Sequence, residues 1–108
     1  MKNTNFLLVG VGGQGTLLAS NVLAHVGVRA GFDVKKAEVH GMAQRGGSVS
    51  SHIRWGEKTY SPLIAQGEAD YLVSFETLEA LRYVEMLRPG GTALVSTIHI
   101  PPLSVSSG

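Results

Sequence analysis

The sequence predicts an α/β protein with a Rossmann-like, three-layer open sheet that is mostly parallel and has an antiparallel hairpin at one edge. Three observations favour this class. The apolar run Phe6 to Val9 is followed directly by glycines and then by a helical pattern, which is the order of an α/β unit. Residues 69–75 indicate a further buried strand. Residues 48–55 alternate apolar and polar side chains, which is typical of a half-exposed strand.

The first half of the chain predicts a strand, a helix and a second strand. Residues 6–9 form the first strand, which ends at Gly10, and residues 16–30 form the helix. Asp33 to Val39 then forms a strand. The order strand, helix, strand predicts a right-handed crossover and parallel pairing. His40 to Gly47 is expected to be a polar loop.

The second half predicts a hairpin, a further α/β unit and a last strand. Residues 48–55 and 59–63 are expected to pair as an antiparallel hairpin at the edge of the sheet. Residues 69–75 form a buried strand, residues 76–87 a helix and residues 92–98 the last strand. The side of this helix that is expected to face the core carries Ala80, Leu81, Val84 and Leu87.

Composition limits the functions that the chain can have. Its 108 residues give room for one domain, expected to span residues 1–108 and to be incomplete, because no closing helix follows the last strand. The net charge is +1 and the basic residues are scattered, so neither a nucleic acid nor a membrane is an expected partner. The chain has no cysteine and can supply no iron–sulfur ligand. With no signal-peptide pattern near the N-terminus, we expect a cytoplasmic protein.

A glycine-rich segment follows the first strand. Gly10, Gly12 and Gly15 match the pattern G-x-G-x-x-G, and Gly13 and Gln14 lie within it. Glycines let the chain turn sharply and present free N–H groups at a helix N-terminus, where the helix dipole favours an anion. These residues are therefore candidates for cofactor binding, and the alternative is that they serve only a tight turn and close packing.

An acidic residue follows this segment at the spacing of a dinucleotide-binding fold. Glu38 comes 23 positions after Gly15 and is expected near the end of the second strand. An acidic residue at this offset holds the ribose hydroxyls in NAD-binding domains. A dehydrogenase domain therefore stays open as an alternative, although an acidic residue at a strand end is common by chance.

The loop between the second and third strands is the other candidate segment. It contains Gln44, Arg45, Gly46 and Gly47, which are predicted to contact a ligand or another subunit. The guanidinium of Arg45 is a fixed fork of donors that suits a phosphate or a carboxylate. The alternative is an ordinary solvated arginine. His52 and Arg54 are expected on the exposed face of the edge strand.

No segment predicts catalysis by this chain alone. The histidines lack the paired spacing of a metal site, so we expect no metal ligand. Neither G-x-S-x-G nor the phosphate-loop lysine is present, and we expect no catalytic residue.

Three segments together resemble a known family. They are GVGGQGTLLASNVLA, EVHGMAQRGGSVSSHIRWG and ADYLVSFETLEALRYVEMLRPGGTALVST. The resemblance is to the gamma-type subunit of 2-oxoacid:ferredoxin oxidoreductases, the pyruvate, ketoisovalerate and indolepyruvate oxidoreductases. The GMAQRGG block is most similar to that of the small (beta) subunit of indolepyruvate ferredoxin oxidoreductase. Family domains continue beyond this length, so the resemblance also implies a C-terminally truncated domain.

The resemblance implies a subunit that does not act alone. In such enzymes a large partner subunit holds thiamine diphosphate and [4Fe-4S] clusters, and the complex converts an arylpyruvate to an acyl-coenzyme A while reducing ferredoxin. It implies coenzyme A as co-substrate and hetero-oligomeric assembly, with self-association as an alternative. The residues of the glycine segment and of the Gln44 to Gly47 block map onto the signatures of the family.

Three other functions stay open at this point. A free-standing NAD(P)-dependent dehydrogenase would need a substrate domain that a chain of this length cannot hold. An S-adenosylmethionine methyltransferase would need an acidic residue at the end of the first strand, where Val9 stands. The third is a non-catalytic nucleotide-binding module.

Overall fold

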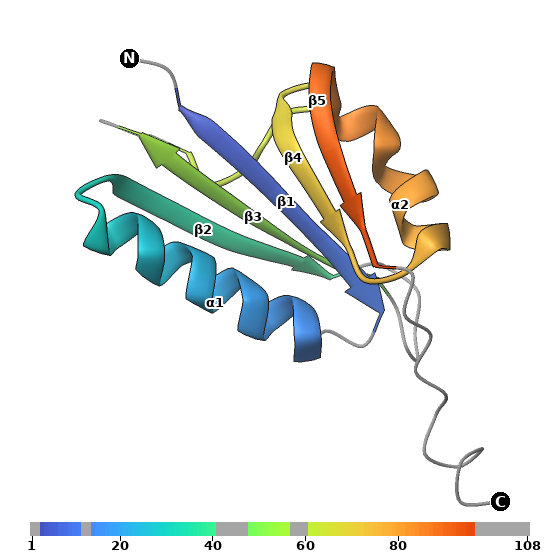
Figure 1. Cartoon of the computed structure of the whole chain (residues 1–108), viewed down its shortest axis with the longest axis horizontal. Coiled ribbons are helices and arrows are strands. Elements are labelled where there is room, and N and C mark those ends of the chain that lie inside the picture. The colour runs from blue at the N-terminus through green and yellow to red at the C-terminus, as the bar shows by residue number, and fades with distance from the viewer. Residues whose placement is uncertain (1–2, 12–13, 41–47, 57–60, 97–108) are drawn as a thin grey trace, which may run out of the picture.

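The structure, a computed structural model, describes residues 3–11, 14–40, 48–56 and 61–96. These residues form one sheet of five strands with two helices, and the strand order is β2-β3-β1-β4-β5 (Figure 1). In chain order the elements are β1 (Thr4–Val11), α1 (Gln14–Arg29), β2 (Asp33–His40), β3 (Ser48–Gly56), β4 (Ala69–Ser74), α2 (Thr77–Tyr83), a 3₁₀ turn (Val84–Met86) and β5 (Leu87–Val95).

The sheet is mixed, with parallel pairing on one side of β1 and antiparallel pairing on the other. β1, β4 and β5 are parallel, whereas β3 is antiparallel to both β1 and β2. The predicted class, an open three-layer α/β sheet with an antiparallel edge hairpin, is confirmed. The hairpin, however, is formed by β2 and β3. Residues 61–63, expected to be part of its second strand, do not form a strand.

The predicted pairing of the first two strands is wrong. β2 runs in the same direction as β1, as expected for a crossover through α1, but β3 lies between them. The chain folds back after β2 and inserts β3 next to β1, so the hydrogen-bonding groups on this side of β1 pair with β3. β3 therefore lies inside the sheet, and β2 forms the edge.

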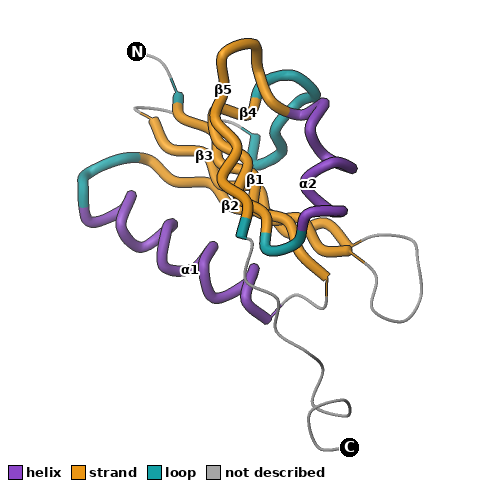
Figure 2. Tube along the Cα trace, turned by 45° about the vertical axis from the view of Figure 1, so that its right-hand side comes forward, coloured by secondary structure: helices purple, strands orange, loops and turns teal. Residues whose placement is uncertain are grey.

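The two helices cover opposite faces of the sheet. α1 packs on β1, β2 and β3, and α2 packs on β1, β4 and β5, with the sheet between them (Figure 2). On the α1 face, Trp55 fits under Gly27, where a Cβ atom would lie 2.5 Å from the indole Nε1. On the α2 face, Leu7, Val9 and Leu72 form the core with Ile64 and Ala69.

The alternating pattern of β3 predicted exposure on one face, which is wrong. Residues 49–53 are all buried, because α1 covers one face of β3 and the segment 61–66 approaches the other. His52, expected to be exposed, retains only 7% of its accessible surface. Its Nδ1 accepts a hydrogen bond from the backbone N–H of Ile64 at 3.0 Å. Arg54, also expected to be exposed, is half-buried.

The second helix is shorter than predicted, and its buried side differs from the expected one. Of the predicted core residues only Ala80 is buried in the helix, next to Glu79, whereas Leu81 is 66% exposed. Val84 falls in the 3₁₀ turn and is half exposed, and Leu87 begins β5. Tyr83 and Met86 supply the contact with the core instead. β5 also includes the glycines that were expected to precede it, and Gly90 has φ +82°, a conformation that favours glycine.

Candidate functional site

The carboxyl ends of β1 and β4 form a topological switch point. The two strands are parallel neighbours, and the chain leaves β1 for α1 on one face of the sheet and leaves β4 for α2 on the other (Figure 1). The connections therefore diverge at this edge. In open α/β sheets ligands bind at such switch points. Gly10, at the end of β1, and Gln14 and Gly15, at the start of α1, lie at this edge.

Backbone hydrogen bonds tie the ends of three parallel strands together. The N–H of Phe75, just after β4, donates to the carbonyl of Val9 in β1 at 3.2 Å. The N–H of Ser96, just after β5, donates to the carbonyl of Ser74 at 2.9 Å. The Ser74 hydroxyl accepts from the N–H of Glu76 at 3.2 Å and closes the turn into α2. The backbone at the carboxyl edge is thus held by these hydrogen bonds.

The two ends of the glycine pattern have different environments. A Cβ atom on Gly10 would lie 2.4 Å from Oγ1 of Thr16, a side chain that is only 2% exposed, so Gly10 is needed for packing. A Cβ atom on Gly15 would meet no atom within 4 Å, and Gly15 is exposed. Within the described residues, packing therefore accounts for Gly10 but not for Gly15. Gly12 and Gly13 lie outside the described residues.

The electrostatics at the start of α1 suit an anion. The helix begins at Gln14, and its first turn contains no acidic residue. The partial positive charge of the exposed N–H groups is therefore not balanced by a side chain of that turn. A phosphate or carboxylate at the switch point would meet this helix end.

The second predicted segment, Gln44 to Gly47, lies outside the described residues. The strand before it, β2, ends at His40, and the strand after it, β3, begins at Ser48, which pairs with Val11 of β1. Both of these strand ends lie at the edge of the sheet where β1 leads into the glycine segment.

The position of Glu38 differs from the one that the ribose prediction assumed, because β2 is not a neighbour of β1. Glu38 pairs with Ser51 of β3, which in turn lies opposite Leu8 of β1. Glu38 is two positions before the end of β2. The strand β3 lies between it and β1, the strand that leads into the glycine segment. The spacing in sequence suggested a contact because it assumed that β2 neighbours β1.

His52 and Arg54 have structural roles away from the switch point. Burial lowers the pKa of His52 below its usual value of 6.5, which fits the neutral ring that accepts from Ile64. Arg54 donates from Nε to Asn5 Oδ1 at 3.0 Å and from Nη1 to the carbonyl of Ser61 at 2.9 Å. It therefore fastens the segment after β3 to the sheet.

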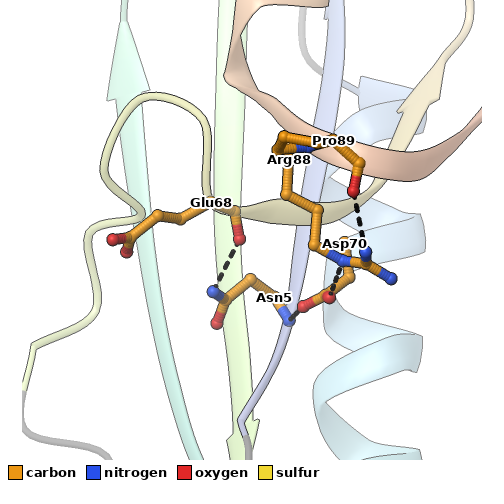
Figure 3. A network of polar contacts seen from close by, with 5 residues as sticks. All are labelled: Asn5, Glu68, Asp70, Arg88 and Pro89. Carbon is orange, nitrogen blue, oxygen red and sulfur yellow. Dashed lines mark hydrogen bonds and ion pairs between the residues drawn. The ribbon is translucent and has the colours of Figure 1, made fainter.

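A polar network that no sequence pattern predicted lies at the opposite, amino edge of the parallel strands. The carboxylate of Asp70 accepts the backbone N–H of Asn5 at 2.7 Å and Nε–H of Arg88 at 2.5 Å (Figure 3). Nη1 of Arg88 donates to the carbonyl of Pro89 at 3.0 Å. The three main residues are far apart in the chain and match no local pattern. Because both Asp70 oxygens have partners from the chain itself, we assign the network a structural role.

Two further properties hold for the described residues. They contain no cluster of three or more histidine, acidic or cysteine side chains that could hold a metal ion. None of the helices in this part of the chain is long and apolar enough to cross a membrane.

Comparison with protein families gives a match over almost the whole chain. The family described as pyruvate ferredoxin/flavodoxin oxidoreductase matches residues 5–107. The curated protein "Indolepyruvate oxidoreductase subunit IorB" of Thermococcus kodakarensis is 47% identical over 108 residues, which are all of this chain and 54% of that protein. The protein of the same name from Archaeoglobus fulgidus is 47% identical over 104 residues, 96% of this chain and 51% of that protein. The chain thus spans about half the length of these relatives.

Solved structures show the same fold. The pyruvate oxidoreductase subunit PORC of Thermotoga maritima superimposes with a TM-score of 0.70 at 28% identity, over 93% of this chain and 53% of that one. The gamma subunit of a keto/oxoacid ferredoxin oxidoreductase from Geobacter sulfurreducens gives 0.69 at 24% identity, over 92% and 56%. The 2-oxoglutarate:ferredoxin oxidoreductase of Magnetococcus marinus, solved with 2-oxoglutarate, coenzyme A and succinyl-CoA, gives 0.71 at 20% identity, over 95% of this chain and 18% of that one.

Proposed function

Because the chain belongs to the pyruvate ferredoxin/flavodoxin oxidoreductase family, we propose that it serves as a gamma-type subunit in a 2-oxoacid:ferredoxin oxidoreductase of the indolepyruvate type. The proposed complex decarboxylates the 2-oxoacid, transfers the acyl group to coenzyme A and passes the two electrons to ferredoxin. The observation that carries this proposal is the similarity to indolepyruvate oxidoreductase subunits, at 40–47% identity over nearly the whole chain.

The redox cofactors of this reaction do not fit this chain. A [4Fe-4S] cluster needs cysteine ligands, and the sequence has none. We therefore assign the clusters and thiamine diphosphate to a large partner subunit and derive no catalytic step from residues of this chain. A cysteine-free subunit also fits a reducing compartment, so the proposed location of the complex is the cytoplasm.

The proposed role of the glycine segment is to bind a phosphate group of coenzyme A. It lies at the switch point of the sheet, and the helix that follows it has no acidic residue in its first turn. Gly15 is exposed with open space around its Cα atom, so a ligand can approach the backbone there. The proposed contacts are Gly12, Gly13, Gln14 and Gly15, with Gly10 holding the turn against Thr16.

The proposed role of Gln44, Arg45, Gly46 and Gly47 is to contact the ligand or the large subunit. The strands on either side of this block end at the edge that carries the glycine segment. An arginine there can bind a phosphate or a partner carboxylate through two parallel hydrogen bonds. Lysine would reproduce the charge of Arg45 but not this geometry.

Reconstitution tests the assignment as a subunit. The purified chain is expected to give no indolepyruvate-dependent reduction of a viologen dye. Adding a large subunit from the same organism, with clustered cysteines and bound thiamine diphosphate, is expected to give reduction that depends on coenzyme A. Turnover by the chain alone would contradict the proposal, and so would a reconstituted complex whose rate does not depend on this chain.

A charge substitution at Gly15 tests the phosphate contact. Gly15→Asp places a negative charge in the first turn of α1, and Gly15→Asn is the matched neutral control. In the reconstituted complex we expect the aspartate variant to bind coenzyme A about fivefold more weakly, and the asparagine variant to stay close to the parent, because an anion at a helix N-terminus contributes about 1 kcal/mol. Binding is measured by isothermal titration, with Arg45→Ala and Arg45→Lys in the same series. Equal affinities for the two Gly15 variants would remove this residue from the site.

A further inference from the structure

Two strands of the sheet lack a cover on one face. α1 packs on β1, β2 and β3, and no described element covers β4 and β5 on the same face. A row of side chains across the sheet shows the effect. Leu8 of β1 is 2% exposed, its neighbour Val73 of β4 is half-buried, and Leu94 of β5, opposite Val73, is 55% exposed. Exposure therefore rises steadily away from α1.

The side of α1 that points toward β4 is apolar and exposed as well. Nζ of Lys36 in β2 donates to Asn21, so this flank of the helix faces β2, while Ser20 faces the sheet and is fully buried. At about 100° per residue, Val26 lies about 140° from Asn21 and about 120° from Ser20, which places it on the opposite flank, toward β4. It is 48% exposed.

These side chains form one apolar surface, which we call the open face. It consists of Val26 of α1, Tyr71 of β4 and Leu94 of β5, and Tyr71 is 38% exposed although its ring stacks on Phe6 at 5.3 Å. Parallel strands are almost always covered on both faces, and an apolar groove between a helix and a sheet is where the next element packs.

The two edges of the sheet also differ. The edge strand β2 carries Asp33, Lys35, Lys36 and Glu38, charges that oppose pairing with a further strand. In β5, residues 89–95 carry no charge, so the part of this edge next to Leu94 is not protected in the same way. The unprotected edge and the open face are thus continuous with each other.

We infer that the open face is covered by a further stretch of the same subunit, the stretch that the longer relatives carry outside the match. The Thermococcus kodakarensis protein matches this chain over only 54% of its length, and the separately solved Geobacter gamma subunit over 56%. Each of these single polypeptides therefore has additional chain of comparable length. The helices and strands of a domain normally cover the faces of its own sheet. Because the uncovered surface here is a face of the sheet, the element that covers it is expected to belong to the same domain.

The absence of cysteine makes a labelling experiment direct. Single cysteines are introduced as Val26→Cys and Leu94→Cys on the open face. Val28→Cys is the matched control, because Val28 is 60% exposed on the flank of α1 that carries Asn21. The rate of reaction with a maleimide is measured in the 108-residue chain and in the same chain extended by the part of the Thermococcus kodakarensis relative that lies outside the match.

In the extended chain we expect the cysteines at positions 26 and 94 to react at least about tenfold more slowly, because labelling then needs local opening, and the cysteine at position 28 to react as before. Equal rates in both forms at all three positions would overturn the inference. Protection of positions 26 and 94 in the 108-residue chain that grows with its concentration would assign the face to a second copy instead. Protection that appears only with the large subunit would assign it to that partner. If the extended chain does not fold by circular dichroism, the same substitutions at the matched positions of the intact relative decide the question.

Discussion

The side chain of His52 lies between the sheet and the segment 61–66, where Nδ1 accepts the backbone N–H of Ile64. An acceptor at Nδ1 requires the neutral ring, and burial lowers the pKa of the side chain below 6.5. The folded protein therefore takes up a proton on this ring less readily than the unfolded chain does.

This difference predicts how stability depends on pH. Above about pH 7 the ring is neutral in both states, and its protonation does not affect the free energy of unfolding. As the pH falls below about 6.5, the unfolded chain binds the proton first, so the free energy of unfolding decreases by at most about 1.4 kcal/mol per pH unit. Urea unfolding between pH 5 and 8 measures the effect. His52→Asn keeps an acceptor without a titrating ring, and its curve is expected to be flatter over this range. If the free energy of unfolding depends on pH in the same way in the parent and in His52→Asn, protonation of His52 does not cause the decrease.

Sequence reasoning found one part of the candidate site and misplaced another. The position of the glycine segment follows from local order, because a buried strand, glycines and a helix come one after another. The role of Glu38 depended on which strand lies next to β1, and a spacing in sequence does not contain that information. The hydrogen bond between His52 and Ile64 likewise joins residues whose contact depends on the path of the chain after β3.

The helix α2 shows why a periodic pattern can mislead in a short element. Leu81 and Val84 recur at the spacing of a helix face, and with Ala80 and Leu87 they were expected to contact the core. The structure buries Ala80 as expected, but it buries Glu79 beside it, and Leu81 is 66% exposed. The helix has only seven residues, so Tyr83 and Met86 near its end decide how it packs. The elements α1 and β1 are longer, and for both of them the sequence correctly predicted that the element exists and whether it is a helix or a strand.

A pair of substitutions in α2 tests this orientation. Leu81→Gln is expected to change the free energy of unfolding by no more than about 0.5 kcal/mol, because the side chain is exposed. Ala80→Leu is expected to destabilise by about 1 to 3 kcal/mol, since the added atoms have no space between helix and sheet. Urea denaturation of both variants gives the comparison. The opposite order of effects would mean that the leucine face packs on the core.

For the whole molecule, Asp70 links the beginnings of the three parallel strands. It lies in β4 and binds the backbone of Asn5 in β1 and the side chain of Arg88 in β5. Its side chain is 9% exposed, whereas the Arg88 side chain is 38% exposed. The contribution of the network therefore comes mainly from satisfying a buried carboxylate and a buried N–H group rather than from a surface ion pair.

Replacing Asp70 with asparagine is expected to lower the free energy of unfolding by about 1 to 3 kcal/mol, because one buried partner then meets a donor instead of an acceptor. Glu68→Gln is the control, since only the backbone carbonyl of Glu68 joins the network, by accepting from Asn5. Thermal unfolding followed by circular dichroism measures both variants. A control as unstable as Asp70→Asn would show that the charge of this region matters and not the specific contacts.

The position of β1 in the sheet has a consequence for synthesis. β1 precedes both of its neighbours in the chain, and its contact with β4 joins residues 65 positions apart, as between Asn5 and Asp70. At a translation rate of about 5 to 20 residues per second, β4 is synthesised several seconds after the apolar strand β1. The hairpin of β2 and β3 is local and folds within microseconds once it has left the ribosome, so it can shield one side of β1 in the meantime. The order of translation thus makes β1 the segment that a chaperone would hold longest on the nascent chain.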